Sequence, residues 1–153
     1  SLQKTPGNWC LIPRYHPNVK KKVAEEIGDK RTFVEVWDEL LLPLGDRVVR
    51  LVAGNSDDMA AVCDAYFSGL GSSLFTALGC GKPTISVLTK ATMEAVYNSK
   101  LNAVPAVEFG GAKTLTEVQD LRSLLVPPSE EVRKKFQPLN PVLAVQEIEK
   151  LLL

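Results

Sequence analysis

The chain has 153 residues, the size of one ordinary domain, with 45% apolar and 24% charged residues, as in typical globular proteins. Eighteen basic side chains balance eighteen acidic ones, so no overall field draws in nucleic acid or an anionic membrane surface. An anionic ligand must therefore be held by a local arrangement of backbone amides or a few side chains.

The cysteines do not suggest a metal centre. Cys10, Cys63 and Cys80 are far apart and form no CxxC pair, and the single histidine, His16, cannot complete a Cys/His cluster. We therefore expect reduced cysteines, no metal and no cofactor. No signal peptide is visible, and the longest aliphatic run, at 40–44, is far too short to span a bilayer. These features predict a cytoplasmic protein without a transmembrane segment.

The first third of the chain predicts two strands with helices between them. The apolar segment 9–13 is typical of a buried strand, and the spacing of apolar residues at 19–27 predicts a helix. Segment 33–44 begins like a strand, but its apolar residues recur at every fourth position, so we expect a helix that ends near Pro43. Segment 47–52, with the sequence RVVRLV, predicts the second strand.

Strand and helix patterns continue to alternate after this point. Ser56 or Asp57 is expected to cap the next helix, whose acidic first turn suits the helix dipole. The predicted elements are, in chain order, a helix at 57–64, a strand at 65–68, a helix at 73–80, a strand at 84–88, a helix at 92–100, a strand at 103–109, and helices at 115–125, 130–136 and 142–153.

This alternation predicts an α/β fold in which residues 1–153 form a single domain. We expect a doubly wound, Rossmann-like and mainly parallel sheet of about five strands, with helices on both faces. Ligands of open α/β sheets bind at the carboxyl ends of the strands. The candidates for a ligand site at that edge are three loops, at 13–18, 53–58 and 69–73.

The loop GLGSS follows the third predicted strand and opens a helix. Gly69 and Gly71 would let the backbone approach a ligand closely, and the amides at the helix start can bind a phosphate. Ser72 and Ser73 would add hydroxyl donors. The same residues also suit a tight strand-helix turn with a serine N-cap, and the loop alone does not decide between the two.

The loop PRYHPN, at 13–18, favours the interpretation of GLGSS as a phosphate site. His16 follows the first predicted strand and could donate a hydrogen bond to a phosphate. Arg14 has a planar, positively charged guanidinium group that suits phosphate. An ordinary surface histidine is the alternative, but its expected position at the same sheet edge as GLGSS favours the ligand site. Asn55 either belongs to a helix cap or borders a base.

Two stretches together resemble a known family. RYHPN (14–18) and YFSGLGSSLFTALGCGKPTISV (66–87) resemble the C-terminal, nucleotide-sugar-binding domain of GT-B glycosyltransferases and the related UDP-N-acetylglucosamine 2-epimerases. Asp64 takes the place of the leading aspartate of the family's donor-pocket pattern. The segment 68–73 matches its glycine-serine turn. The later positions of the pattern are matched by Ala77, Gly81 and Pro83.

Bacterial sialyltransferases and capsule-polymer transferases, enzymes of polysaccharide biosynthesis, carry a His-Pro and a Ser-Ser motif on this domain. The pairs His16-Pro17 and Ser72-Ser73 resemble these motifs, which contact the donor nucleotide and its phosphate. Thr76 occupies the position at which the family commonly has a glutamate that binds the donor ribose. The resemblance therefore implies a UDP-, CMP- or CDP-linked sugar as the ligand.

The resemblance also implies a missing partner. GT-B enzymes place donor and acceptor between two such domains, so the chain is expected to be the C-terminal half of a two-domain enzyme, inactive without its N-terminal domain. The resemblance assigns no catalytic residue to this half. A nucleotide-sugar 2-epimerase domain and a non-catalytic α/β interaction module are the alternatives.

Overall fold

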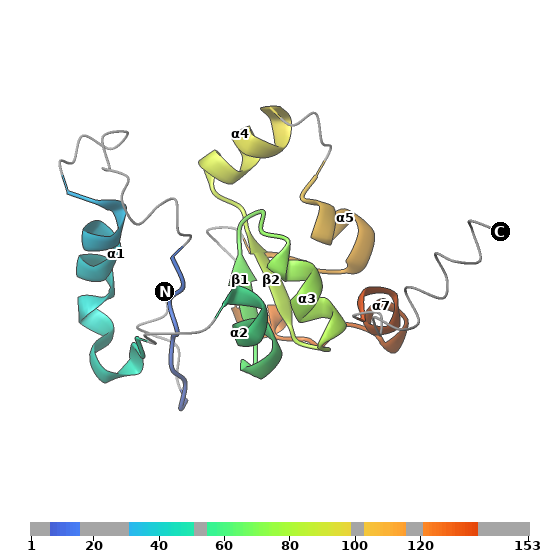
Figure 1. Ribbon diagram of the computed structural model, residues 1–153, viewed down its shortest axis with the longest axis horizontal. Coiled ribbons are helices and arrows are strands. Elements are labelled where there is room, and N and C mark those ends of the chain that lie inside the picture. Colours follow the sequence, from blue (N-terminus) through green and yellow to red (C-terminus); the bar gives the residue numbers. More distant parts are fainter. Residues whose placement is uncertain (1–6, 16–30, 51–54, 99–102, 116–120, 138–153) are drawn as a thin grey trace. The chain divides into compact units, whose positions relative to one another are not determined.

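The structure is a computed structural model that describes five stretches of the chain (Figure 1), residues 7–15, 31–50, 55–98, 103–115 and 121–137. The chain divides into two compact units, residues 1–54 and 55–153, and each is described by itself.

The first unit contains a well-capped helix. Helix α1 (Phe33–Leu41) begins after Thr32, whose hydroxyl accepts a hydrogen bond from the Glu35 N–H while the Glu35 carboxylate accepts one from the Thr32 N–H. This reciprocal pair is a capping box. The 3-10 helix η3 (Leu42–Arg47) follows directly and carries a proline in its first turn. The helix predicted at 33–44 is therefore confirmed, with a change of helix type at its end.

Within the described residues, the two strands predicted in this unit meet in an isolated parallel bridge, Leu11 with Val48. The Leu11 N–H donates to the Arg47 carbonyl at 2.7 Å, and the Val49 N–H donates to the Leu11 carbonyl at 2.9 Å. The 3-10 helix η3 continues to Arg47, so the backbone becomes extended later than the sequence predicts. The helix predicted at 19–27 lies outside the described residues, as does that at 142–153.

The second unit is a mixed α/β structure around a small open sheet. Strands β1 (Tyr66–Ser68), β2 (Thr84–Val87) and β3 (Lys113–Leu115) are parallel and lie in the order β1-β2-β3. The strands predicted at 65–68 and 84–88 are thus confirmed. The helices of this unit are α2 (Ser56–Val62), α3 (Ser73–Gly79), α4 (Lys90–Asn98), α5 (Pro105–Gly110), α6 (Leu121–Leu124) and α7 (Glu130–Phe136).

The prediction of a strand at 103–109 is wrong, because α5 occupies this segment. Pro105 lies in the first turn of the helix, where its missing N–H costs nothing, and Gly111 ends the helix with a left-handed φ of 87°. The third strand of the sheet is β3. The sequence analysis placed the start of a helix at Leu115, which instead pairs with Val87 of β2.

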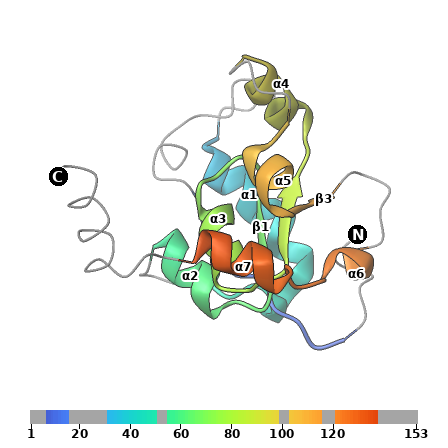
Figure 2. The same ribbon diagram turned by 90° about the vertical axis from the view of Figure 1, so that its right-hand side faces the viewer.

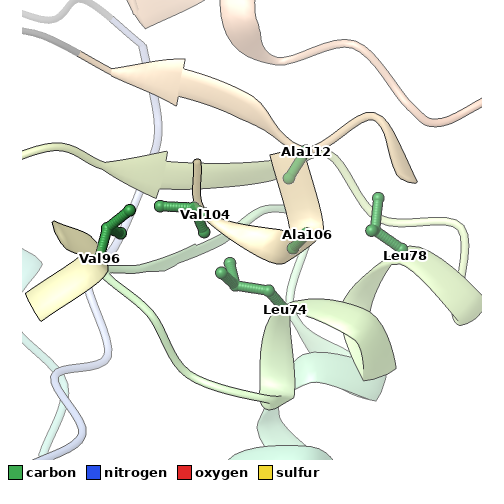
Figure 3. Close-up of a cluster of buried hydrophobic side chains, with 6 residues drawn as sticks. All are labelled: Leu74, Leu78, Val96, Val104, Ala106 and Ala112. Carbon is green, nitrogen blue, oxygen red and sulfur yellow. The ribbon is translucent and has the colours of Figure 1, made fainter. Parts of the chain in front are cut away.

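The core of the second unit lies where the helices meet. Figure 3 shows a cluster of buried side chains contributed by α3, α4, α5 and the segments next to α5, and the cluster consists of Leu74, Leu78, Val96, Val104, Ala106 and Ala112. Helix α7 packs against α3 and lies in front of it in Figure 2, and the rings of Phe75 and Phe136 pack with their centroids 5.0 Å apart.

Candidate functional site

The candidate site is the turn of residues 69–73, which joins β1 to α3 at the carboxyl end of β1. The Leu74 N–H donates to the Gly71 carbonyl at 3.1 Å, and the Phe75 N–H donates to the Ser72 carbonyl at 2.9 Å. The turn therefore leads into the helix without a break. It has no charged side chain. Its amides and hydroxyls can donate hydrogen bonds to an anionic oxygen.

The two serines of the turn have different environments. Ser72 is exposed, occupies the N-cap position and makes no capping hydrogen bond with its side chain. Its backbone angles are helical (φ −59°, ψ −26°), whereas a capping side chain needs an extended residue. Ser73 is buried, and its hydroxyl oxygen accepts a hydrogen bond from the Tyr66 phenol at 2.8 Å. Ser72 is thus the outward-facing hydroxyl of the pair.

The two glycines lie in crowded surroundings. A β-carbon at Gly71 would lie 3.0 Å from the Ser68 hydroxyl oxygen and 3.1 Å from that of Ser73. At Gly69, a β-carbon would lie 3.1 Å from the Thr92 hydroxyl oxygen. Neither glycine has a positive φ. Hydroxyl groups from the strand, the turn and α4 therefore approach the backbone of the turn closely, which the sequence analysis did not foresee.

A second row of hydroxyl-bearing residues crosses the sheet beneath the turn. Ser68, Ser86 and Thr114 are register partners on the three parallel strands, so their side chains share one face of the sheet. Ser86 is fully buried, and its hydroxyl donates to the Gly69 carbonyl at 2.9 Å. Small hydroxyl residues at alternate positions of a buried strand, Thr84 and Ser86, are the sequence signal that could have indicated this row.

The segment after β2 adds two threonines at the same edge, Thr89 before α4 and Thr92 in its first turn. The Thr92 N–H donates to the Thr89 hydroxyl oxygen at 3.1 Å, and the two hydroxyl oxygens lie 3.0 Å apart. The Thr92 hydroxyl also lies close to Gly69, as described above. Loops after two adjacent strands thus bring neutral hydroxyl groups together.

Two of the predicted site residues have partners at helix α2. Asn55 is the N-cap of this helix, because its side-chain oxygen accepts a hydrogen bond from the Asp58 N–H at 2.8 Å. The sequence analysis placed this N-cap at Ser56 or Asp57, one or two residues too late, so that prediction is wrong. The Thr76 hydroxyl donates to the Asp57 carboxylate at 2.9 Å. Asn55 therefore stabilises the start of α2, and Thr76 joins α3 to α2.

The loop RYHPN is described only in part. Arg14 is exposed and belongs to the first unit, and His16 lies outside the described residues. The predicted meeting of this loop with the turn of residues 69–73 stays a prediction.

The first unit holds a polar cluster that the sequence analysis missed. The Tyr15 phenol donates to the Asp38 carboxylate at 2.6 Å, and Arg50 forms an ion pair with the same carboxylate. The hydrogen bond from Tyr15, followed by the pairing with Arg50, lowers the pKa of Asp38 below its ordinary value. Burial, reinforced by the hydrogen bond to Asp38, raises the pKa of Tyr15. No pattern in the sequence links residues this far apart.

Within the described residues, no three metal-ligating side chains gather into a possible metal site. The same part of the chain contains no helix with the length and apolar character needed to cross a membrane. Comparisons with protein-family models, with curated proteins and with solved structures find no match to this chain.

Proposed function

We propose that the chain is the donor-binding domain of a GT-B glycosyltransferase that holds the nucleotide phosphate of an activated sugar at the turn of residues 69–73. The observation that carries the proposal is the position of this turn. It follows a strand of a parallel sheet at the carboxyl end, where α/β folds bind ligands, and it presents the exposed hydroxyl of Ser72. Within the described residues, the N–H groups of Leu70, Gly71 and Ser72 donate to no backbone carbonyl.

The proposal includes a larger, doubly wound and Rossmann-like sheet of about five strands with helices on both faces. In that arrangement the segments 9–13 and 47–52 are strands of the same sheet, and Arg14 and His16 follow the first of them at the edge that binds the phosphate. The positive charge of Arg14 and the hydrogen-bond donors of both side chains would stabilise the departing phosphate without a metal. An N-terminal domain of the same cytoplasmic polypeptide would bind the acceptor and supply the catalytic base.

The ligand is a UDP-, CMP- or CDP-linked sugar. Thr76 stands at the position of the family's ribose-binding glutamate, and its hydroxyl donates to Asp57. A threonine in this state offers the ribose at most a weak contact, so the phosphate carries most of the binding. Because the ribose is the same in UDP, CMP and CDP, we expect their affinities to differ through the base and the number of phosphates and not through Thr76.

Titration of the chain with UDP, CMP and CDP tests the proposal directly. We expect a rise in melting temperature that grows with nucleotide concentration, and shifts of the NMR signals of Gly69, Gly71 and Ser72. A chain that responds to none of the three nucleotides contradicts the proposal and favours a non-catalytic interaction module.

Two serine substitutions separate binding from folding. Ser72→Ala removes an exposed hydroxyl that makes no cap hydrogen bond, so it should weaken nucleotide binding about fivefold and leave stability nearly unchanged. Ser129→Ala is the matched control, because Ser129 caps α7 through a hydrogen bond from the Val132 N–H at 3.3 Å. It should lower stability by about 1 kcal/mol and leave the affinity unchanged.

A further inference from the structure

The inference concerns Ser86, a polar residue at a position where a sheet normally holds an apolar one. Its side chain is fully buried in the middle of the central strand β2. A buried hydroxyl is costly unless it is hydrogen-bonded, and Ser86 meets this condition by donating to the Gly69 carbonyl at 2.9 Å. The bond joins the centre of the sheet to the first residue of the turn of residues 69–73.

This bond fixes the direction of a peptide group. The peptide between Gly69 and Leu70 is planar and trans, as no cis peptide occurs in the described residues. Its carbonyl oxygen and its N–H therefore point in opposite directions. Since Ser86 holds the Gly69 carbonyl toward the sheet, the Leu70 N–H is directed away from Ser86. The Leu70 N–H donates to no backbone carbonyl within the described residues.

The far end of the turn is held in a similar way. The Tyr66 phenol donates to the Ser73 hydroxyl oxygen at 2.8 Å, so a side chain of β1 anchors the last residue of the turn. The turn thus has a hydrogen bond from the sheet at each end. Between these anchors lie the residues whose amides the proposed phosphate would use.

We propose that Ser86 is a positioning residue for the phosphate-binding turn, which acts by holding the Gly69 carbonyl so that the amides of the turn face the ligand. The effect of Ser86 on nucleotide affinity rests on the proposed function. Its effect on the turn itself does not depend on any ligand.

A matched control exists on the same strand. Thr84 is also buried, and its hydroxyl donates to a backbone carbonyl, that of Lys82, at 2.8 Å. This bond lies at the amino end of β2, away from the turn. Ser86→Ala and Thr84→Val each remove one buried hydroxyl and leave one carbonyl without its partner. A role for Ser86 in stability alone predicts that both variants lose stability and that neither loses nucleotide affinity specifically.

The experiment compares the two variants with the unmodified full chain at a temperature where all three are folded. Amide NMR shifts of Leu70, Gly71 and Ser72 are recorded without ligand, and affinity for CMP and UDP is then measured. Ser86→Ala should shift the amides of the turn and weaken nucleotide binding about five- to tenfold. Thr84→Val should do neither. Ser86→Cys keeps the size and a weak donor, so it should give intermediate values.

The outcomes separate this proposal from the proposed function. If the unmodified chain binds nucleotide and Ser86→Ala binds it equally well, the positioning role is overturned while the proposed function stands. If the unmodified chain binds no nucleotide, the proposed function fails, and the amide shifts alone decide whether Ser86 positions the turn. Shifts of the turn amides in Ser86→Ala and not in Thr84→Val then support the positioning role, and equal shifts overturn it. If Ser86→Ala does not fold, Ser86→Cys takes its place in each comparison.

Discussion

The Thr76 hydroxyl donates a hydrogen bond to the Asp57 carboxylate at 2.9 Å, which joins α3 to the first turn of α2. The two residues are 19 positions apart in the sequence. The resemblance to GT-B enzymes places Thr76 at a ribose-binding position, whereas the structure gives its hydroxyl a partner within the protein.

A double-mutant cycle measures this contact. Thr76→Val and Asp57→Ala should each destabilise the fold, and the double variant should lose less than the sum of the two. We expect a coupling free energy of about 0.5–1 kcal/mol, because the pair is exposed and one partner is charged. Urea denaturation of the four proteins gives the value. Strictly additive losses would show that the hydrogen bond contributes nothing to stability.

Gly110→Ala should destabilise the second unit by about 1–3 kcal/mol through overpacking. A β-carbon at Gly110 would lie 2.4 Å from Cε2 of Phe136 and 3.0 Å from Cδ1 of Leu78, so the Phe136 ring must move. In a Phe136→Leu background the added cost of Gly110→Ala should fall, because the smaller side chain leaves room. Thermal or urea unfolding measures both costs.

The neighbouring glycine is the control for this prediction. Gly111 has a φ of 87°, and a β-carbon there would meet only Val132, at 3.8 Å. Gly111→Ala should therefore cost about 1 kcal/mol through backbone strain alone. That cost should not change in the Phe136→Leu background. Equal rescue of both alanine variants would show that Phe136 does not act through contact with Gly110.

The cluster of Tyr15, Asp38 and Arg50 makes the stability of the first unit depend on pH at both extremes. The lowered pKa of Asp38 contributes stability above its ordinary pKa of 3.8, and this is lost as the pH falls through the lower folded value. The raised pKa of Tyr15 contributes stability below its ordinary pKa of 10.0, and this is lost as the pH rises through the higher folded value.

Tyr15→Phe should move the pKa of Asp38 up toward 3.8, because it removes the hydrogen bond that is the largest cause of the shift. It should also abolish the alkaline dependence that Tyr15 contributes. Carboxylate NMR titration of Asp38 measures the first effect. Tyr97→Phe, at an exposed tyrosine of α4, is the control and should leave the titration of Asp38 unchanged. An Asp38 titration that Tyr15→Phe does not alter would contradict the assignment.

Asn55→Ala should lower stability by about 1 kcal/mol, because Asn55 accepts the Asp58 N–H as the N-cap of α2. Asn55→Asp should retain most of the stability, since aspartate is an equally good N-cap. The same two variants separate capping from contact with a base. A change in nucleotide affinity for Asn55→Asp at unchanged stability would assign the Asn55 amide to the ligand.

The sequence alone identified the elements whose signals are local. The stripe of apolar residues with Thr32 before it specifies α1, because a capping box and one apolar face are properties of consecutive residues. The run from 65 to 88 likewise predicts β1, α3 and β2, since apolar strands and a glycine-serine turn alternate there. The same local signals predict a candidate site at the turn of residues 69–73, and this stays a prediction.

The failures arose where a local pattern is ambiguous. Val104 and Ala106 are buried because they pack in the core, and a short buried apolar run looks the same in a helix and in a strand. Pro105 at the first helical turn was the signal for α5 that the apolar pattern outweighed. Strand β3 lacks the buried apolar run that marks β2, because its first residue, Lys113, is exposed, and its pairing with β2 defines it.

The composition and order of residues thus determined that strands and helices alternate and that a glycine-serine turn follows a strand. Only the tertiary structure decided what holds that turn in place. Ser86 meets Gly69 because parallel pairing brings the centre of β2 next to the end of β1, and Phe136 of α7 meets Gly110 of α5 because both helices pack against α3. Contacts of this kind join residues distant in sequence, and their partners are selected by packing rather than by any pattern of neighbouring residues.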